Sequence, residues 1–249
     1  MKIVMNDISL LKDSLDAISG LINEATFEFS PEGLTLKAID PAIVAMTMLK
    51  MLPTCFSQYE IESTVKITVN LDYFLEVLKR VKQSDKVIIE LDNAKGVLKV
   101  SMRGNMNREF LIALIENPEK EQKVPNPEFE GEIIVDNNVL REAVKNCQMV
   151  SDCATFIANN EWFEISASGD LNNVKQELTK DSPFLKQLRY PIEQKSKYSL
   201  EYLDKIIRGD KVSEQTIIKF KTDYLLMVEY KTIDKISLTF ILAPRVDND

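Results

Sequence analysis

The stretch Leu21-Ile22-Asn23-Glu24-Ala25-Thr26-Phe27 decides the fold of this chain, because its last three residues return as Ala154-Thr155-Phe156. The two copies lie 129 residues apart (154 minus 25), and the same offset relates Leu71-Asp72-Tyr73 to Leu200-Glu201-Tyr202. Further matches at this offset are Asp7 with Asp136, Leu11 with Leu140, Leu15 with Val144, Leu36 with Ile165, Ala38 with Ala167, and Ile88-Ile89 with Ile217-Ile218. A repeat of this length predicts two similar domains rather than a solenoid of short units.

The composition is that of a soluble globular protein. The chain has 249 residues, of which 45% are hydrophobic and 28% are charged, enough for two cores of roughly a hundred residues each. No apolar run approaches the roughly 18 residues of a membrane span, and the N-terminus lacks a basic segment followed by an apolar one. We therefore expect a cytoplasmic protein without a membrane partner.

The chain contains no histidine, which excludes several kinds of active site. Ser-His-Asp triads, Cys-His dyads and His-metal sites are all impossible within it. Its three cysteines, Cys55, Cys147 and Cys153, form no Cys-x-x-Cys pair, so we expect reduced structural thiols. The 39 Asp and Glu residues could still bind magnesium, but most alternate with apolar residues, as Glu90 and Glu164 do on what reads as a solvated strand face. We predict no catalytic residue, no metal site and no cofactor.

Each half contains two amphipathic helices, recognised by apolar residues spaced three or four apart. The apolar positions are Leu11, Leu15, Ile18 and Ile22, then Phe74, Leu78 and Val81 in the first half, and Leu140, Val144 and Cys147, then Leu203 and Ile207 in the second. Asp7 and Asp136 precede the first helix of each half, where a side-chain oxygen can accept the unpaired amide hydrogens of the first turn. Each helix therefore has one face to bury and one to expose.

The other segments alternate as strands do, and in the first half we predict them at 27–29, 34–39, 44–49, 65–69, 87–91, 97–102 and 110–115. Several antiparallel strands with two helices on one face give an α+β domain. Between the halves, residues 116–128 carry three prolines and six charges, a composition typical of an exposed connector. We predict an N-terminal domain at 1–115, a connector at 116–128 and a C-terminal domain at 129–249.

The basic residues repeat at the same offset. The net charge of −8 argues against a protein that binds nucleic acid over most of its surface, so the distribution of the cations matters more than their sum. At the 129-residue offset, Lys12 matches Arg141 and Lys79 matches Arg208. Other cations on or beside the same helices are Arg80, Lys82, Lys145, Lys205 and Lys211. Because acidic residues share these helices, charge alone favours an ordinary solvated helix face.

Near the C-terminus stands Phe240-Ile241-Leu242-Ala243-Pro244-Arg245-Val246. This motif resembles archaeal proliferating cell nuclear antigen, the DNA sliding clamp, as do four others: Leu21-Ile22-Asn23-Glu24-Ala25, Ile39-Asp40-Pro41 ahead of Val44, Ser166-Ala167-Ser168-Gly169 and Val228-Glu229-Tyr230-Lys231. The resemblance implies a processivity-clamp fold in which three two-domain subunits close into a ring around duplex DNA. Such a clamp is not an enzyme. It would raise the processivity of DNA polymerase and work at the nucleoid, within the cytoplasm.

The resemblance implies that the helices line the ring with weak, sequence-independent contacts, since strong phosphate pairing would hinder sliding. The implied DNA-facing residues are Lys12, Lys79, Arg80, Lys82, Arg141, Lys145, Lys205 and Arg208. Asp13, Asp16 and Glu201 stand where relatives often carry cations, so we expect a thinly charged wall.

The resemblance also implies a groove for a hydrophobic plug of client proteins, namely DNA polymerase, clamp loader, flap endonuclease and ligase. The implied groove residues are Ile39, Val44, Met46, Val124, Pro125, Leu225, Ile241, Ala243 and Pro244, some of which are equally explained as core. Val124 and Pro125 belong to the connector, where with Phe129 they either pin it to the sheets beneath or form one lip of the groove. Ile241 falls where many relatives have an aromatic residue.

The subunit interface implied by the resemblance joins two edge strands, because a closed ring satisfies every sheet edge. Its residues would be Phe110, Ile112 and Leu114 on one subunit and Val174, Gln176 and Leu178 on its neighbour. The ring could be a homotrimer or a heterotrimer with paralogous subunits. Residues 182–192 are more apolar and more basic than in relatives, and they either discriminate between neighbours or form a packed local loop.

Two other functions remain open at this point. One is a metal-dependent nuclease that uses clustered carboxylates. The other is a checkpoint-type clamp subunit, which has a similar fold but serves damage signalling.

Overall fold

The computed structural model describes residues 1–116 and 127–245. Most of the predicted connector, including Val124 and Pro125, lies outside these residues. The chain divides into two compact units, which we describe separately. Among the described residues, unit 1 comprises 1–41, 47–116 and 232–238, and unit 2 comprises 42–46, 127–231 and 239–245. Each unit therefore holds one half of the repeat and a short segment of the other half, and the domain boundaries drawn from the sequence stay a prediction.

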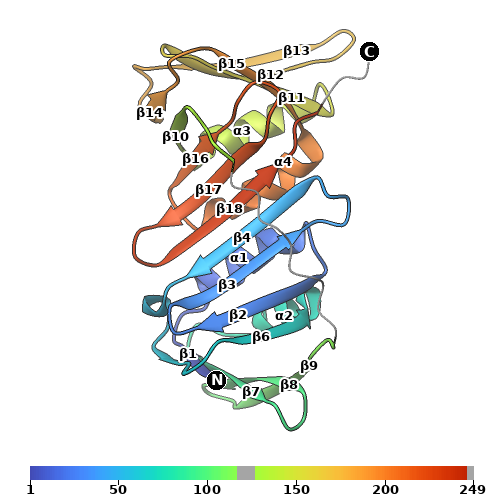
Figure 1. The fold of residues 1–249 in the computed structure, drawn as a ribbon, viewed down its shortest axis with the longest axis vertical. Coiled ribbons are helices and arrows are strands. Elements are labelled where there is room, and N and C mark those ends of the chain that lie inside the picture. Colours follow the sequence, from blue (N-terminus) through green and yellow to red (C-terminus); the bar gives the residue numbers. More distant parts are fainter. Residues whose placement is uncertain (117–126, 246–249) are drawn as a thin grey trace. The chain divides into compact units, whose positions relative to one another are not determined.

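Unit 1 is built from antiparallel strands and two helices, α1 (Ser9–Ser19) and α2 (Leu71–Leu78) (Figure 1). One sheet has, in spatial order, β5 (Gln58–Glu60), β1 (Lys2–Met5), β7 (Lys86–Asp92), β8 (Val97–Arg103) and β9 (Arg108–Ala113). A second row consists of β4 (Ala45–Met51), β3 (Gly33–Ile39), β2 (Glu24–Ser30) and β6 (Val65–Asn70), and a 3-10 turn, η1 (Pro53–Cys55), follows β4. The predicted strands of this half are present, whereas the short strands β1 and β5 lie outside the predicted ranges, because each has too few residues to show alternation.

Unit 2 repeats this plan with α3 (Asn137–Gln148), α4 (Leu200–Ile206) and a 3-10 turn, η2 (Ile207–Lys211). One row has β14 (Leu185–Arg189), β10 (Glu132–Asp136), β16 (Gln215–Lys219), β17 (Leu226–Thr232) and β18 (Ile236–Leu242). The four-stranded sheet has β13 (Asn173–Thr179), β12 (Trp162–Ser168), β11 (Cys153–Ala158) and β15 (Gln194–Ser199). Helix α3 contacts α4 and packs against β10, β11, β12, β13 and β16. The α+β class with two helices per half is confirmed.

The sequence repeat is also a repeat of strand register. Phe27 of β2 lies opposite Leu36 of β3 on one side and Ile67 of β6 on the other. In unit 2, Phe156 of β11 lies opposite Ile165 and Ser196. All three positions are displaced by 129 residues, so each half aligns its strands in the same way. A slip of one residue would turn every side chain to the other face, and the shared register therefore specifies the same core in both units.

The apolar stripes of the helices face these cores. Leu11, Leu15 and Ile18 of α1 are 0–1% exposed, and Leu140, Val144 and Cys147 of α3 are equally buried. Burial raises the pKa of the Cys147 thiol to about 11, as expected for an unreactive structural cysteine. The second helices are shorter than predicted, since α2 ends at Leu78 before Val81, and Ile207 begins η2.

The N-caps differ from the prediction. Ile8, not Asp7, is the residue before the first turn of α1, although the Asp7 carboxylate still accepts the Ser9 amide hydrogen at 2.8 Å. This hydrogen bond with Ser9 lowers the pKa of Asp7. Asp136 does cap α3 by position, but its side chain makes no capping hydrogen bond and instead lies 3.2 Å from Lys186 Nζ. The competing lysine comes from β14, which pairs with β10.

Residues 182–192 are integrated into unit 2. Five of them form β14, and the buried Tyr190 donates a hydrogen bond from its hydroxyl to the Phe220 carbonyl at 2.9 Å. Phe184 and Ile192, at either side of this strand, remain 54% and 60% exposed. The segment is thus anchored in the core and carries two exposed apolar side chains.

Candidate functional site

The predicted DNA-facing cations all lie on or directly after the four helices. Lys12 belongs to α1, Lys79 is the C-cap residue directly after α2, Arg141 and Lys145 belong to α3, and Lys205 belongs to α4. The remaining three are Arg80 and Lys82, which follow α2, and Arg208, in η2. Since α1 contacts α2 and α3 contacts α4, each unit brings its predicted cations onto one helix pair.

Four of these eight cations have an acidic partner on or beside their own helix pair. Lys79 Nζ lies 3.2 Å from Glu76 and 3.9 Å from Asp16. Lys205 Nζ lies 3.0 Å from Glu201 and 4.9 Å from the centroid of the Tyr202 ring. The other pairs are Lys12 with Asp13 at 4.0 Å and Arg208 with Asp204 at 3.8 Å. Exposed pairs of this kind contribute less than about 1 kcal/mol, but they reduce the charge offered to a ligand.

Arg141 differs, because its partner is buried. Both Nε and Nη2 of Arg141 donate to one carboxylate oxygen of Asp210, a residue only 7% exposed. The Asp210 carbonyl also accepts a hydrogen bond from Asn137 Nδ2 at 2.6 Å. The pKa of the nearby Tyr230 is held well above its usual range, chiefly by burial and secondly by the negative charge of Asp210. Arg141 therefore ties α3 to η2. Sequence reasoning missed Asp210, whose partner lies 69 residues away.

Arg80, Lys82 and Lys145 are exposed, and within residues 1–116 and 127–245 none of them forms a salt bridge. Among the predicted DNA-facing cations, these three therefore have the charge that is least neutralised by acidic side chains of the described residues.

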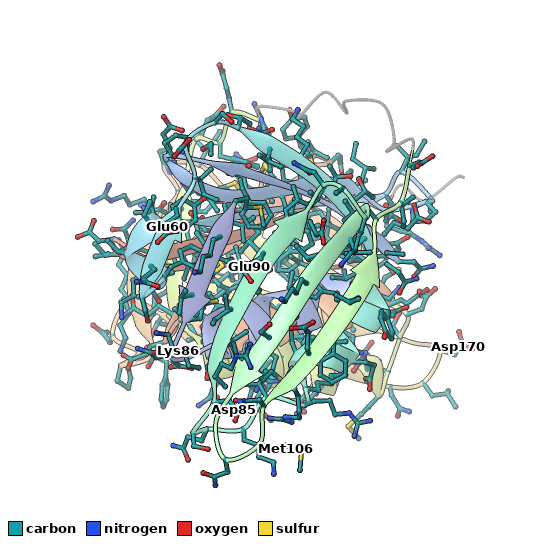
Figure 2. The ribbon with its side chains drawn as sticks, turned by 90° about the horizontal axis from the view of Figure 1, so that it is seen from below. Glu60, Asp85, Lys86, Glu90, Met106 and Asp170 are labelled. Atoms are coloured by element: carbon teal, nitrogen blue, oxygen red, sulfur yellow. The ribbon has the colours of Figure 1, made fainter. Side chains whose placement is uncertain are left out.

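The start of β9 is fixed to the end of α2 by a second nearly buried carboxylate. Asp85, 4% exposed, accepts the Lys82 amide hydrogen at 2.8 Å and pairs with Nη2 of Arg108. Nη1 of Arg108 donates to the Arg80 carbonyl at 2.7 Å. Figure 2 looks onto this sheet, with Glu90 on its open face and Asp85 and Met106 at the same end. The contacts hold Arg80 and Lys82 beside the first residue of the edge strand.

Six of the predicted groove residues gather in unit 2. The Ala243 amide donates to the Val44 carbonyl at 2.9 Å, which joins the C-terminal segment to residues 42–46. Met46 and Ile241 are 4% and 3% exposed, so both serve chiefly as core. The half-buried members are Val44, Leu225, Ala243 and Pro244. Ile39, also half-buried, belongs to unit 1, while Val124 and Pro125 lie outside the described residues.

Two further features lie beside these groove residues. Ile43, next to Val44, is 80% exposed and has a φ of 59°, a backbone conformation that is costly for a β-branched side chain. Phe129 stacks edge-on against Tyr224 with ring centroids 6.3 Å apart. Tyr224 in turn lines a cavity of about 460 Å³ with Glu128, Lys221 and Thr222.

Both predicted interface segments lie at sheet edges. In the described part of the chain, β9 pairs only with β8, and β13 pairs only with β12. Phe110 and Ile112 lie opposite Val100 and Leu98, both fully buried, so they project from the face that packs on the core. The remaining residue of this edge, Leu114, follows β9 and donates its amide to the Gly96 carbonyl at 3.1 Å.

On β13, Val174, Gln176 and Leu178 share the half-buried face. The Gln176 side chain accepts a hydrogen bond from Asn146 at 2.8 Å and donates one to the Ala143 carbonyl at 3.3 Å, which fastens the strand to α3. Side-chain hydrogen bonds thus fasten both edge strands to neighbouring elements, while within the described residues one side of each strand has no partner in its sheet.

A family model described as proliferating cell nuclear antigen, N-terminal domain, matches residues 1–122. A DNA polymerase sliding clamp of Thermococcus onnurineus is 34% identical over 99% of this chain and 99% of its own length. One of Nanoarchaeum equitans is 34% identical over 99% of this chain and its whole length. The chain belongs to the DNA polymerase sliding clamp family.

Solved structures of this family share the fold. The crystal structure of proliferating cell nuclear antigen from Thermococcus kodakaraensis superposes with a TM-score of 0.91 at 29% identity, covering 98% of this chain and 99% of the other. A clamp subunit from a Sulfolobus tokodaii complex reaches 0.90 at 24% identity over 99% of this chain and all of its own, a likeness that shows the fold alone. Both agree with the two-unit sliding clamp architecture.

Two further observations concern the residues that the structure describes. In that part of the chain, no helix is long and apolar enough to span a membrane. Within 1–116 and 127–245, no group of three or more Cys, Asp or Glu residues is placed to hold a metal ion.

Proposed function

We propose that this chain is a non-enzymatic DNA sliding clamp subunit, three of which close into a ring around duplex DNA and raise the processivity of DNA polymerase. The repeated register carries the proposal. Phe27 with Leu36 and Phe156 with Ile165 give each half the same strand alignment, and a ring of such units presents equivalent helices all round a duplex. Family membership supports the same function.

The DNA contact in this proposal is weak and independent of sequence. The cations of the helix pairs face the duplex, but Lys79, Lys205 and Arg208 are partly neutralised by Glu76, Glu201 and Asp204. A topological link needs little binding energy, and few released counterions mean few strong phosphate contacts that would oppose sliding. Arg80, Lys82 and Lys145 supply the least neutralised charge.

Client proteins dock, in this proposal, beside Val44, Leu225, Ala243 and Pro244, with Val124 and Pro125 of the connector as the opposing lip. The Ala243–Val44 hydrogen bond supports this site, because it fixes the C-terminal segment next to the loop that carries Val44. An apolar plug in a preformed groove binds at low entropic cost. The clients are DNA polymerase, clamp loader, flap endonuclease and ligase, and the protein works in the cytoplasm at the nucleoid.

The test of this function combines assembly and activity. The mass in solution is measured by analytical ultracentrifugation, alone and with sister subunits from the same organism, and the length of polymerase products is compared with and without the protein. We expect a trimeric mass and longer products on a primed circular template. A monomer under all conditions with unchanged product length would contradict the proposal. Cleavage of labelled DNA that a chelator abolishes would favour the nuclease instead.

A further inference from the structure

The 3-10 turn η2 presents two cations on one side. Arg208 and Lys211 are exposed, whereas the other three residues of the turn are buried. Residues three apart in a 3-10 helix are eclipsed and lie about 6 Å apart along its axis. Neighbouring like charges repel, and the acid beside them, Asp204, comes no closer than 3.8 Å to Arg208. A doublet of this kind is suited to an anion from outside the turn.

The sequence repeat contains this doublet twice. At the offset of 129 residues, Arg208 matches Lys79, and Lys211 matches Lys82 (211 minus 82). Lys79, Lys82 and Arg208 belong to the predicted DNA-facing residues, whereas Lys211 does not. Because the doublets follow the second helix of each unit, the same ligand suits both, and the ligand predicted for the first doublet is duplex DNA.

The buried side of η2 is fastened to α3. Nε and Nη2 of Arg141 donate to the Asp210 carboxylate, and Nδ2 of Asn137 donates to the Asp210 carbonyl at 2.6 Å. Gly209 packs so closely that a Cβ atom at this position would come within 2.5 Å of the Tyr230 ring. The turn therefore cannot shift along α3 without breaking a buried ion pair, which is costly.

Unit 1 holds its own turn with different residues. Asp85, 4% exposed, accepts the Lys82 amide hydrogen at 2.8 Å and pairs with Arg108. Asp210 stands where unit 1 has Val81, so the two buried pairs are not equivalent in the repeat. The two units therefore share a fixed position of the turn that carries the cations, and they reach it through different ion pairs.

We infer that the Arg141–Asp210 pair positions η2 so that Lys211, with Arg208, contacts DNA phosphates, and that Arg141 itself contacts none. The inference rests on the proposed clamp function. An arginine binds a phosphate most strongly through two N–H groups at once, and Arg141 directs Nε and Nη2 at Asp210 instead. Arg141 is thus a positioning residue, although its place on α3 suggests a DNA contact.

Lys211→Gln tests the proposed contact. Fluorescence anisotropy of a labelled linear duplex, measured over a range of salt concentrations, gives the binding constant and its dependence on salt. We expect Lys211→Gln to bind more weakly and to reduce the log–log slope by about 0.9 for each phosphate contact that it removes. Lys219→Gln, which removes a β16 cation paired with Glu132 at 2.9 Å, should keep the wild-type slope. An unchanged slope in Lys211→Gln would overturn the inference.

A double-mutant cycle tests the positioning role. Arg141→Met should weaken DNA binding, but it should have no further effect in a chain that carries Arg208→Gln and Lys211→Gln, because Arg141 acts through these two residues. Arg141→Lys, a milder change that keeps the charge but not the two-donor contact, goes through the same cycle. Circular dichroism at the assay temperature checks that the variants are folded. Strictly multiplicative effects would show that Arg141 contacts DNA directly and would overturn its positioning role.

The length of polymerase products separates this inference from the proposed function. If the wild-type chain lengthens the products while the cycle is multiplicative, the inference is wrong and the clamp function stands. If the wild-type chain neither binds the duplex nor lengthens the products, both are wrong.

Discussion

The Arg141 guanidinium donates two hydrogen bonds to a single oxygen of Asp210, and that carboxylate is almost completely buried. The pair joins α3 to η2, and its two residues lie 69 positions apart in the chain. At the equivalent position of the repeat stands Lys12, whose nearest acid, Asp13 at 4.0 Å, is partly exposed. Arg141 and Lys12 are equivalent in the repeat, yet Arg141 pairs with a buried carboxylate of another element and Lys12 pairs with a partly exposed one on its own helix.

We predict that Arg141→Ala lowers the free energy of unfolding by about 2–3 kcal/mol, because it leaves the Asp210 carboxylate buried without its partner. Lys79→Ala, which removes a cation from an exposed pair, should cost less than about 1 kcal/mol. Urea unfolding followed by circular dichroism measures both. If Arg141→Ala and Lys79→Ala lower the free energy of unfolding by the same amount, Arg141 is an ordinary surface residue.

We predict that Lys79→Glu combined with Arg208→Glu impairs loading onto nicked circular DNA. Reversal of these charges turns weak attraction into repulsion of the phosphates, and the loss should be most visible at higher salt, where screening already weakens the remaining contacts. Retention of the ring on the circle after gel filtration is the measurement. Lys95→Glu, at an exposed hairpin position, is the control. An equal loss of trimer would show that the two residues serve the interface instead.

We predict that Val124→Ser together with Pro125→Ala weakens client-peptide binding about tenfold and leaves ring assembly intact, because apolar anchors dominate the affinity of short peptides. Fluorescence anisotropy of a labelled client peptide measures the affinity, and the same peptide with its apolar anchors replaced by alanine gives the background. If the peptide binds the variant as well as the wild type, the connector is not part of the groove.

We predict that the protein loses stability at alkaline pH. Burial raises the pKa of Tyr59 from 10.0 to about 12, and burial likewise raises the pKa values of Tyr190, Tyr198 and Tyr230. The folded protein holds these phenol protons more tightly than the unfolded chain does. The stability that the protonated tyrosines contribute is therefore complete below pH 10 and is lost as the pH rises through 12.

The urea midpoint as a function of pH measures this loss, with the absorbance of tyrosinate as a second signal. Tyr59→Phe should show a smaller loss than the wild type, since its proton no longer titrates. A midpoint that does not change between neutral pH and pH 12 would contradict the prediction.

The core of each unit could be predicted from the sequence, because it depends on periodicity. Leu11, Leu15 and Ile18 are spaced for one helix face, and all three are buried in the structure. Strands such as β2 and β8 alternate clearly and lie where expected. The short strand β5 carries too few residues for alternation to show.

The candidate site could be predicted only in part. The repeat and the family motifs placed the cations on the helices and the interface segments on edge strands. They did not predict Asp210 or Asp85, because the role of each depends on which residues distant in the chain are brought together. Asp136 was misassigned as a side-chain cap for the same reason, since Lys186 reaches it from another strand.

The sequence by itself determined the duplication, the α+β class and the burial of each helix stripe, because hydrophobic spacing acts over a few neighbouring residues. The tertiary structure alone decided which charges remain available. Arg141 and Lys145 look alike on α3, yet Arg141 is bound to Asp210 and Lys145 forms no salt bridge within the described residues. The reason is physical: an ion pair depends on separation in space and on burial, and neither is encoded in the spacing of residues along one helix.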